Sequence, residues 1–112
     1  MKHILLTLIV LVAAGALLAH PPMKVSLDYD QAGHVLTVKY QHEVGDPAQH
    51  FIDDITVMLN GELMVTQLQH SQPGSDGGMV LYLLTDAKAG DKVEVKLECN
   101  KGGHKTGELT VE

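Results

Sequence analysis

The sequence predicts an all-β fold, namely one immunoglobulin-like sandwich of about seven antiparallel strands. Apolar residues recur with a period of two, the period of a half-buried strand, through nearly all of the chain after residue 19. Clusters of Gly, Asn, Asp and Pro separate these runs at regular spacing, as in β-sandwiches. Of the 112 residues, the 93 after residue 19 suffice for one small domain and not for two.

The first two strands are expected over residues 25–29 and 36–40, with a turn at 31–34. In both runs the apolar side chains alternate with polar ones, so each strand has one face suited to a core. His42 is the next residue on the apolar face of the second strand. The alternating apolar residues are Val25, Leu27 and Tyr29, then Leu36, Val38 and Tyr40.

A hairpin is expected around Asn60-Gly61, the strongest short-range hairpin signal in the chain. It joins a strand that ends at Leu59 to a strand over residues 62–68. Asp53 falls on the apolar side of the first of these strands, which predicts a β-bulge or a late strand start. The last three strands are expected over residues 79–84, 92–98 and 106–111, and Cys99 follows the apolar face of the middle one.

The first nineteen residues are typical of a secretory signal peptide. A basic start precedes an apolar run over residues 4–18, and the small residue Ala19 follows. Cleavage there divides the chain into a signal peptide, 1–19, and a domain, 20–112, that is periplasmic or secreted. An alternative cut after Ala16 starts the product at Leu17. A retained membrane anchor is the third interpretation, although the run is short for a bilayer.

The charge balance argues against nucleic acid and anionic membrane surfaces as partners. The chain has eight basic residues, all Lys, against fourteen Asp plus Glu, and Lys2 lies in the predicted signal peptide. Six of the seven histidines follow residue 19, a high density of a common transition-metal ligand. Acidity and histidine content together favour a cation.

His42, His50, Cys99 and His104 are the candidate metal ligands. Each follows or precedes a predicted strand, so loops would bring imidazoles and a thiolate to one end of the sandwich. This ligand set suits iron, copper or zinc. Cys99 is the only cysteine, and in an oxidising compartment such a residue is buried, paired between chains, or held by a metal.

These residues resemble the iron domain of superoxide reductases and desulfoferrodoxins. Tyr40 to Val111 is the part of the chain that the resemblance covers. The sequence departs from the family pattern in these motifs: Glu43 replaces a proline, seven residues separate His42 from His50 where the family has fewer, and Gly102 stands where a histidine follows the cysteine. The motifs that carry the resemblance are His42, His50, Phe51, Ile52 and Ile55, the Asn60-Gly61 hairpin, the Ala89-Gly90-Asp91 turn, and Cys99-Asn100.

The resemblance implies non-haem iron held by histidines in a plane and by one axial cysteine, with an open position where superoxide is reduced to peroxide. It assigns His42 and His50 to the plane and Cys99 to the axial position, with His104 as a displaced substitute. The implied partners are a metal ion, superoxide and an external electron donor. No counterpart of the family's upstream Glu-Lys-His segment is found in the sequence, so residual superoxide-reducing activity is the expectation.

Two other functions stay open. A new N-terminus at His20 could chelate copper through its imidazole and amine, with Met23 for the cuprous ion and one more imidazole from His34, His70 or His104. The domain could instead be an interaction module with a degenerate metal site. The acidic residues Glu43, Asp46, Asp53 and Asp54 lack the spacing of a calcium loop and predict a solvated rim, and Ser71 and Ser75 have no organised catalytic partner.

Overall fold

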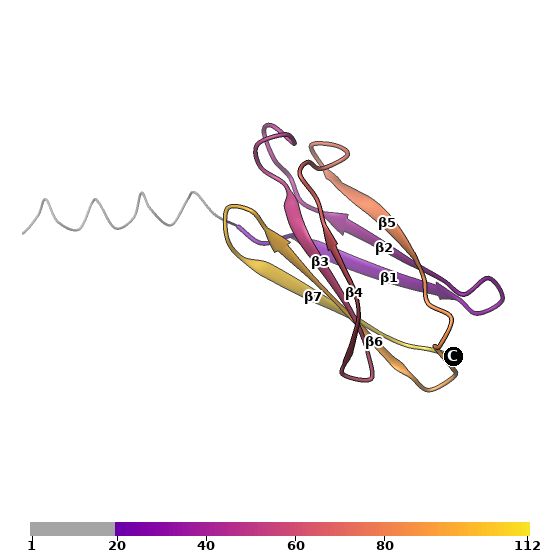
Figure 1. Cartoon of the computed structure of the whole chain (residues 1–112). Helices are drawn as coiled ribbons and strands as arrows, with labels where there is room; N and C mark the ends of the chain where they lie inside the picture. The colour runs from indigo at the N-terminus through magenta and orange to yellow at the C-terminus, as the bar shows by residue number, and fades with distance from the viewer. Residues whose placement is uncertain (1–19) are drawn as a thin grey trace, which may run out of the picture.

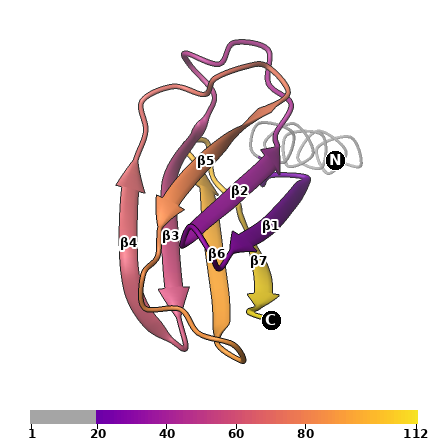
Figure 2. The same ribbon diagram turned by 90° about the vertical axis from the view of Figure 1, so that its right-hand side faces the viewer.

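The computed structural model describes residues 20–112, which form seven antiparallel strands in two packed sheets (Figures 1 and 2). One sheet has the order β1-β2-β5 and the other β4-β3-β6-β7. The predicted all-β sandwich is confirmed. The predicted signal peptide, 1–19, lies outside the described residues. The strands are β1 Lys24–Asp30, β2 Val35–Gln41, β3 Ile52–Leu59, β4 Glu62–Leu68, β5 Gly77–Leu83, β6 Lys92–Cys99 and β7 His104–Thr110.

The core lies between the sheets and is built mainly from β2, β3 and β6. Their inward residues are apolar at every second position, so each strand buries one face. Within residues 20–112, no helix is long and apolar enough to cross a membrane. The core side chains with no exposed surface are Leu36, Val38, Ile52, Ile55, Val57, Val93, Val95 and Leu97.

The Asn60-Gly61 hairpin turn and the bulge at Asp53 form as the sequence predicts. Asn60 and Gly61 both have positive φ, 50° and 84°, as a two-residue hairpin turn requires, and they join β3 to β4. The pairing of β3 with β6 shifts register between Ile52 and Asp54, so the bulge predicted at Asp53 is confirmed.

Two strands begin earlier than the hydrophobic pattern indicated. β5 starts at Gly77 because this residue and Gly78 pair with Gln41 and Tyr40 of β2. At Gly77 a Cβ atom would lie 2.0 Å from the Tyr40 carbonyl oxygen, so only glycine permits the approach. β7 starts at His104, which pairs with Glu98 of β6. The apolar period cannot predict this pairing, because the pairing depends on contacts between backbones and not on apolar side chains.

Four chain segments meet at one end of the sandwich. The start of β1 pairs with the end of β2, Lys24 opposite Gln41, and the start of β3 pairs with the end of β6, Ile52 opposite Cys99. In Figures 1 and 2 the loop between β2 and β3 and the turn between β6 and β7 both lie at this end. The antiparallel topology therefore gathers residues from across the sequence there.

Candidate metal centre

Three histidines, His20, His42 and His50, form a cluster at this end of the sandwich. One ring nitrogen from each lies within 4.8 Å of the other two. The ring centroids are 5.0 Å apart for His20 and His42, 4.8 Å for His20 and His50, and 5.0 Å for His42 and His50. Since the rings come from the segment before β1, the end of β2 and the loop before β3, tertiary structure alone brings them together.

His42 is held in the form that a metal requires. Its side chain has no exposed surface, and its Nδ1 lies 2.7 Å from Oε1 of the buried Gln72. An amide oxygen only accepts hydrogen bonds, so Nδ1 carries a proton, and in the neutral ring Nε2 is the nitrogen with the lone pair. Within the described part of the chain, Nε2 is buried and has no hydrogen-bond partner. A buried lone pair without a partner is costly unless something binds it.

Gln72 contacts both the ring and the backbone of His42. Its Oε1 accepts from His42 Nδ1, and its Nε2 donates to the carbonyl oxygens of His42, at 2.8 Å, and of Gly74, at 2.9 Å. The amide of His42 also donates to the Asp76 carbonyl oxygen at 2.8 Å. An orienting hydrogen bond on the far nitrogen is the usual support of a metal-binding histidine. Nothing in the sequence pattern singled out Gln72.

His50 and Cys99 are direct neighbours, with 3.1 Å between Nε2 and Sγ. The pKa of His50 lies below its usual 6.5 because burial disfavours the charged ring and because His42, His20 and Lys101 repel a further positive charge. This imidazole is therefore kept neutral, the state in which it binds metals.

Cys99 is a buried thiol at the end of β6, 5% exposed. Burial raises its pKa, although the Lys101 amide, which donates to Sγ at 3.4 Å, favours the thiolate. The metal-free residue is consequently a thiol, and a bound cation would displace its proton. The structure thus places Cys99 against His50 and His50 in the histidine cluster, while the cluster itself consists of His20, His42 and His50.

Asn100 joins the loop before β3 to the turn after β6 and so holds His50 next to Cys99. Its Oδ1 accepts from the Phe51 amide at 3.0 Å, its Nδ2 donates to the Gln49 carbonyl at 3.0 Å, and its own amide donates to the Phe51 carbonyl at 3.0 Å. Asp46 turns the chain before this point, because its carbonyl accepts from the His50 amide at 2.9 Å. The residue after the cysteine is therefore a clamp between two loops.

His20 is held in place by residues 21–23, which contact both sheets. The Met23 amide donates to the Gln41 carbonyl at 2.7 Å, and Lys105 Nζ donates to the Met23 carbonyl at 3.1 Å. Pro21 packs on the turn between β6 and β7 so closely that a Cβ at Gly103 would lie 2.9 Å from its nitrogen. The sequence predicts His20 only as part of a separate copper site, paired with His34, His70 or His104. In the structure its partners are His42 and His50.

His104, the fourth predicted ligand, is not part of the cluster. It is exposed and occupies the first position of β7, opposite Glu98. Gly102 and Gly103, with φ of 109° and 84°, close the turn after Cys99, and the Cys99 amide donates to the Gly103 carbonyl at 3.0 Å. The glycines therefore form a tight hairpin turn and do not fold the chain back toward the cluster.

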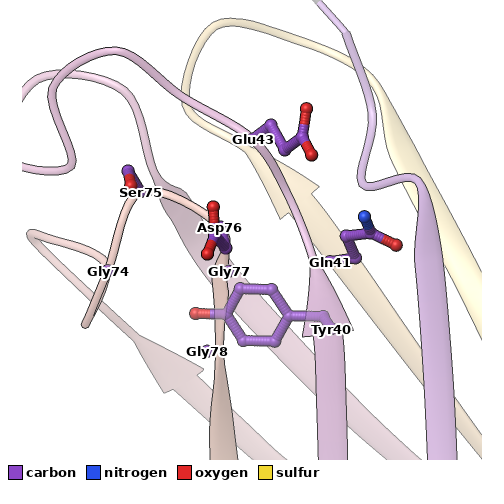
Figure 3. A pocket seen from close by; sticks show the side chains of 8 residues that line it. All are labelled: Tyr40, Gln41, Glu43, Gly74, Ser75, Asp76, Gly77 and Gly78. Carbon is purple, nitrogen blue, oxygen red and sulfur yellow. The ribbon is translucent and has the colours of Figure 1, made fainter.

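Acidic side chains border the site. A hollow of about 640 Å³ lies between the end of β2 and residues 74–78, and Glu43 and Asp76 are among the residues that line it (Figure 3). The Tyr40 ring extends across it toward Gly78. A second hollow of about 450 Å³ is lined by residues 20–23 and Glu43. These carboxylates create a field that favours cations at this end of the domain.

Two solved structures share this fold. A hypothetical protein from Pyrococcus horikoshii OT3 matches 86% of this chain and 91% of its own, with a TM-score of 0.53 and 18% identity. A superoxide reductase (neelaredoxin) from Ignicoccus hospitalis matches 89% of this chain and 86% of its own, with a TM-score of 0.50 and 16% identity. No family model and no curated protein matches the chain. At these identities the comparison shows a distant relationship of fold.

Proposed function

We propose that this protein is an exported metal-binding domain that holds non-haem iron with His20, His42, His50 and Cys99 and reduces superoxide. The observation that carries the proposal is the buried lone pair of His42 Nε2, which faces no protein partner among residues 20–112 and belongs to a cluster with two other imidazoles. Export is supported by the signal-like sequence of residues 1–19.

The distance between His50 and Cys99 supports their binding one ion together. An ion about 2.1 Å from a nitrogen and about 2.3 Å from a sulfur keeps the two about 3.1 Å apart at right angles and about 3.6 Å apart in a tetrahedron. The observed 3.1 Å between His50 Nε2 and Cys99 Sγ matches the right angle. The histidine nitrogens, up to 4.8 Å apart, need to approach by roughly 1 Å or more, because two nitrogens bound to one ion are about 3.0 Å apart at right angles and about 4.2 Å apart on opposite sides.

The protein's own residues prepare this site for redox chemistry. Gln72 and Asn100 fix His42 and His50, so little reorganisation accompanies binding. Bound iron would supply one-electron exchange, and a thiolate ligand would increase its electron density. Superoxide gains one electron and two protons to leave as hydrogen peroxide, and an external donor restores the electron. The carboxylates of Glu43 and Asp76 oppose the approach of an anion, so we expect slow turnover.

Iron content and superoxide consumption test the proposal together. The exported protein, purified without oxygen, should contain iron, show a thiolate-to-iron absorption band when oxidised, and consume pulsed superoxide in its reduced form. Cys99→Ser should lose the band and His42→Ala should lose the iron. His104→Ala is the matched control, because His104 lies outside the cluster. Equal iron in the wild type and His42→Ala would reject the site.

A copper carrier is the second candidate, favoured by His20 in the cluster and by Met23, which is 56% exposed and lines the same hollow as His20. Thioether and thiolate ligands select the cuprous ion. Competition between cuprous and ferrous ions for the metal-free protein separates the two functions. Preference for copper that falls in Met23→Leu would support the carrier, whereas an unchanged preference would count against a role for the thioether.

A further inference from the structure

The backbone nitrogen of His20 has a chemical state that depends on where the chain is cut. As long as Ala19 precedes it, this nitrogen is an amide, whose lone pair is shared with the carbonyl group and which binds a metal only after losing its proton. After cleavage behind Ala19 it is an α-amine, which can offer a lone pair to a metal. The imidazole of the same residue already belongs to the histidine cluster.

We propose that His20 becomes a two-nitrogen ligand on export, binding the metal through its α-amine and its imidazole. The inference rests on the metal site proposed above. The amine and Nδ1 of one histidine close a six-membered ring with an ion, so both nitrogens can bind the same ion. Nδ1 lies 3.3 Å from the Pro21 carbonyl oxygen, a long contact that a half-buried ring gives up at little cost.

The two residues after His20 leave the amine without a backbone competitor. Pro21 and Pro22 both lack an N–H, so neither peptide nitrogen can lose a proton and bind the ion. At an ordinary N-terminus a metal can bind successive deprotonated amide nitrogens, but here the first two peptide nitrogens belong to prolines and cannot bind it. The proline pair also restricts the segment, which the Met23 amide holds to Gln41. The α-amine is thus the single backbone nitrogen that residues 20–22 can present.

The consequence is that export and metal loading are coupled. The uncut chain offers three imidazoles and a thiolate, while the cut chain offers the same four groups and an amine. The precursor would hold the metal more weakly than the mature protein. A chain that starts at Ala19 has an amide at His20, and a chain that starts at Pro21 has no His20 at all. The added amine ligand therefore depends on cleavage directly before His20.

Two forms of the protein test the inference, one starting at His20 and one at Ala19. Both retain every strand, because β1 begins at Lys24 and β7 ends at Thr110. Zn²⁺ affinity is measured by competition with a chelator, and Co²⁺ absorption reports the number of donors. The His20 form should bind Zn²⁺ about tenfold or more tightly than the Ala19 form, the scale on which metal sites respond to lost supporting groups. Zn²⁺ should also protect the His20 amine from reductive methylation.

Equal Zn²⁺ affinity in the two forms, with the amine methylated equally in the presence and absence of Zn²⁺, would overturn the inference. The variant His42→Ala in the His20 form separates this failure from failure of the metal site. If His42→Ala loses Zn²⁺ while the two forms bind alike, the site is correct and the amine is no ligand. If His42→Ala binds Zn²⁺ as tightly as the His20 form, the metal site itself is wrong and the inference fails with it.

Discussion

Gly103→Ala should weaken metal binding although residue 103 is no ligand. In the structure Gly103 has φ of 84°, and a Cβ there would lie 2.9 Å from the nitrogen, 3.1 Å from Cδ and 3.2 Å from Cα of Pro21. Pro21 is the neighbour of His20, so the segment must shift to admit the methyl group. We expect this shift to carry His20 away from His42 and His50.

Gly61→Ala is the matched control, because Gly61 also has φ of 84° and, among the described residues, nothing lies within 4 Å of a Cβ placed there. Both variants force alanine into the left-handed region, at a cost of about 1–2 kcal/mol of folding free energy. Only Gly103→Ala adds the clash with Pro21. Ordinary contacts begin near 3.4 Å, so Pro21 must move by roughly 0.5 Å or tilt, enough to misplace a metal ligand.

The assay is chemical denaturation of the metal-free proteins followed by Zn²⁺ competition. We expect both variants to lose similar stability, and only Gly103→Ala to lose metal affinity, by about 10- to 100-fold, as when ligand orientation is lost. The reasoning would be refuted if Gly103→Ala and Gly61→Ala bound Zn²⁺ equally, because the segment before β1 would then reach the cluster without its contact to the β6–β7 turn.

Three further outcomes are expected. Gln72→Leu should lower Zn²⁺ affinity by about 10- to 100-fold by freeing the His42 ring, and wild-type affinity in this variant would show that Gln72 does not orient it. The pKa of His50 lies below its unfolded value of 6.5, so the unfolded state binds more protons at this residue, and the stability of the metal-free protein should fall as the pH drops below 6.5. Denaturation of His50→Gln should show a weaker dependence of stability on pH. An equal dependence would exclude His50 as the cause. The buried Tyr82 hydroxyl, whose pKa burial raises to about 12, has no hydrogen-bond partner within the described chain, so Tyr82→Phe should leave thermal stability equal or higher, by up to about 1 kcal/mol, and a clear loss would indicate a partner.

Local chemistry let the sequence predict most of the fold. The two-residue period, the Asn60-Gly61 turn and the displaced Asp53 each act through neighbouring residues, so they can be read along the chain. The positions of His42 and Cys99, each one step beyond the apolar face of a strand, likewise follow from the period. What could not be read was that Gly77 starts a strand, because its pairing depends on a close approach to Tyr40 across the sheet.

The sequence by itself determined the sandwich, the strands that end near His42, His50 and Cys99, and the acidic, histidine-rich composition that favours a cation. Only the tertiary structure decided which histidines meet. His20 joins the cluster because β1 pairs with β2 and Pro21 packs on Gly103, and His104 stays out because Gly102 and Gly103 form a tight turn. A metal site is defined by distances of a few ångströms between residues far apart in sequence, and those distances are set by strand pairing and not by spacing along the chain.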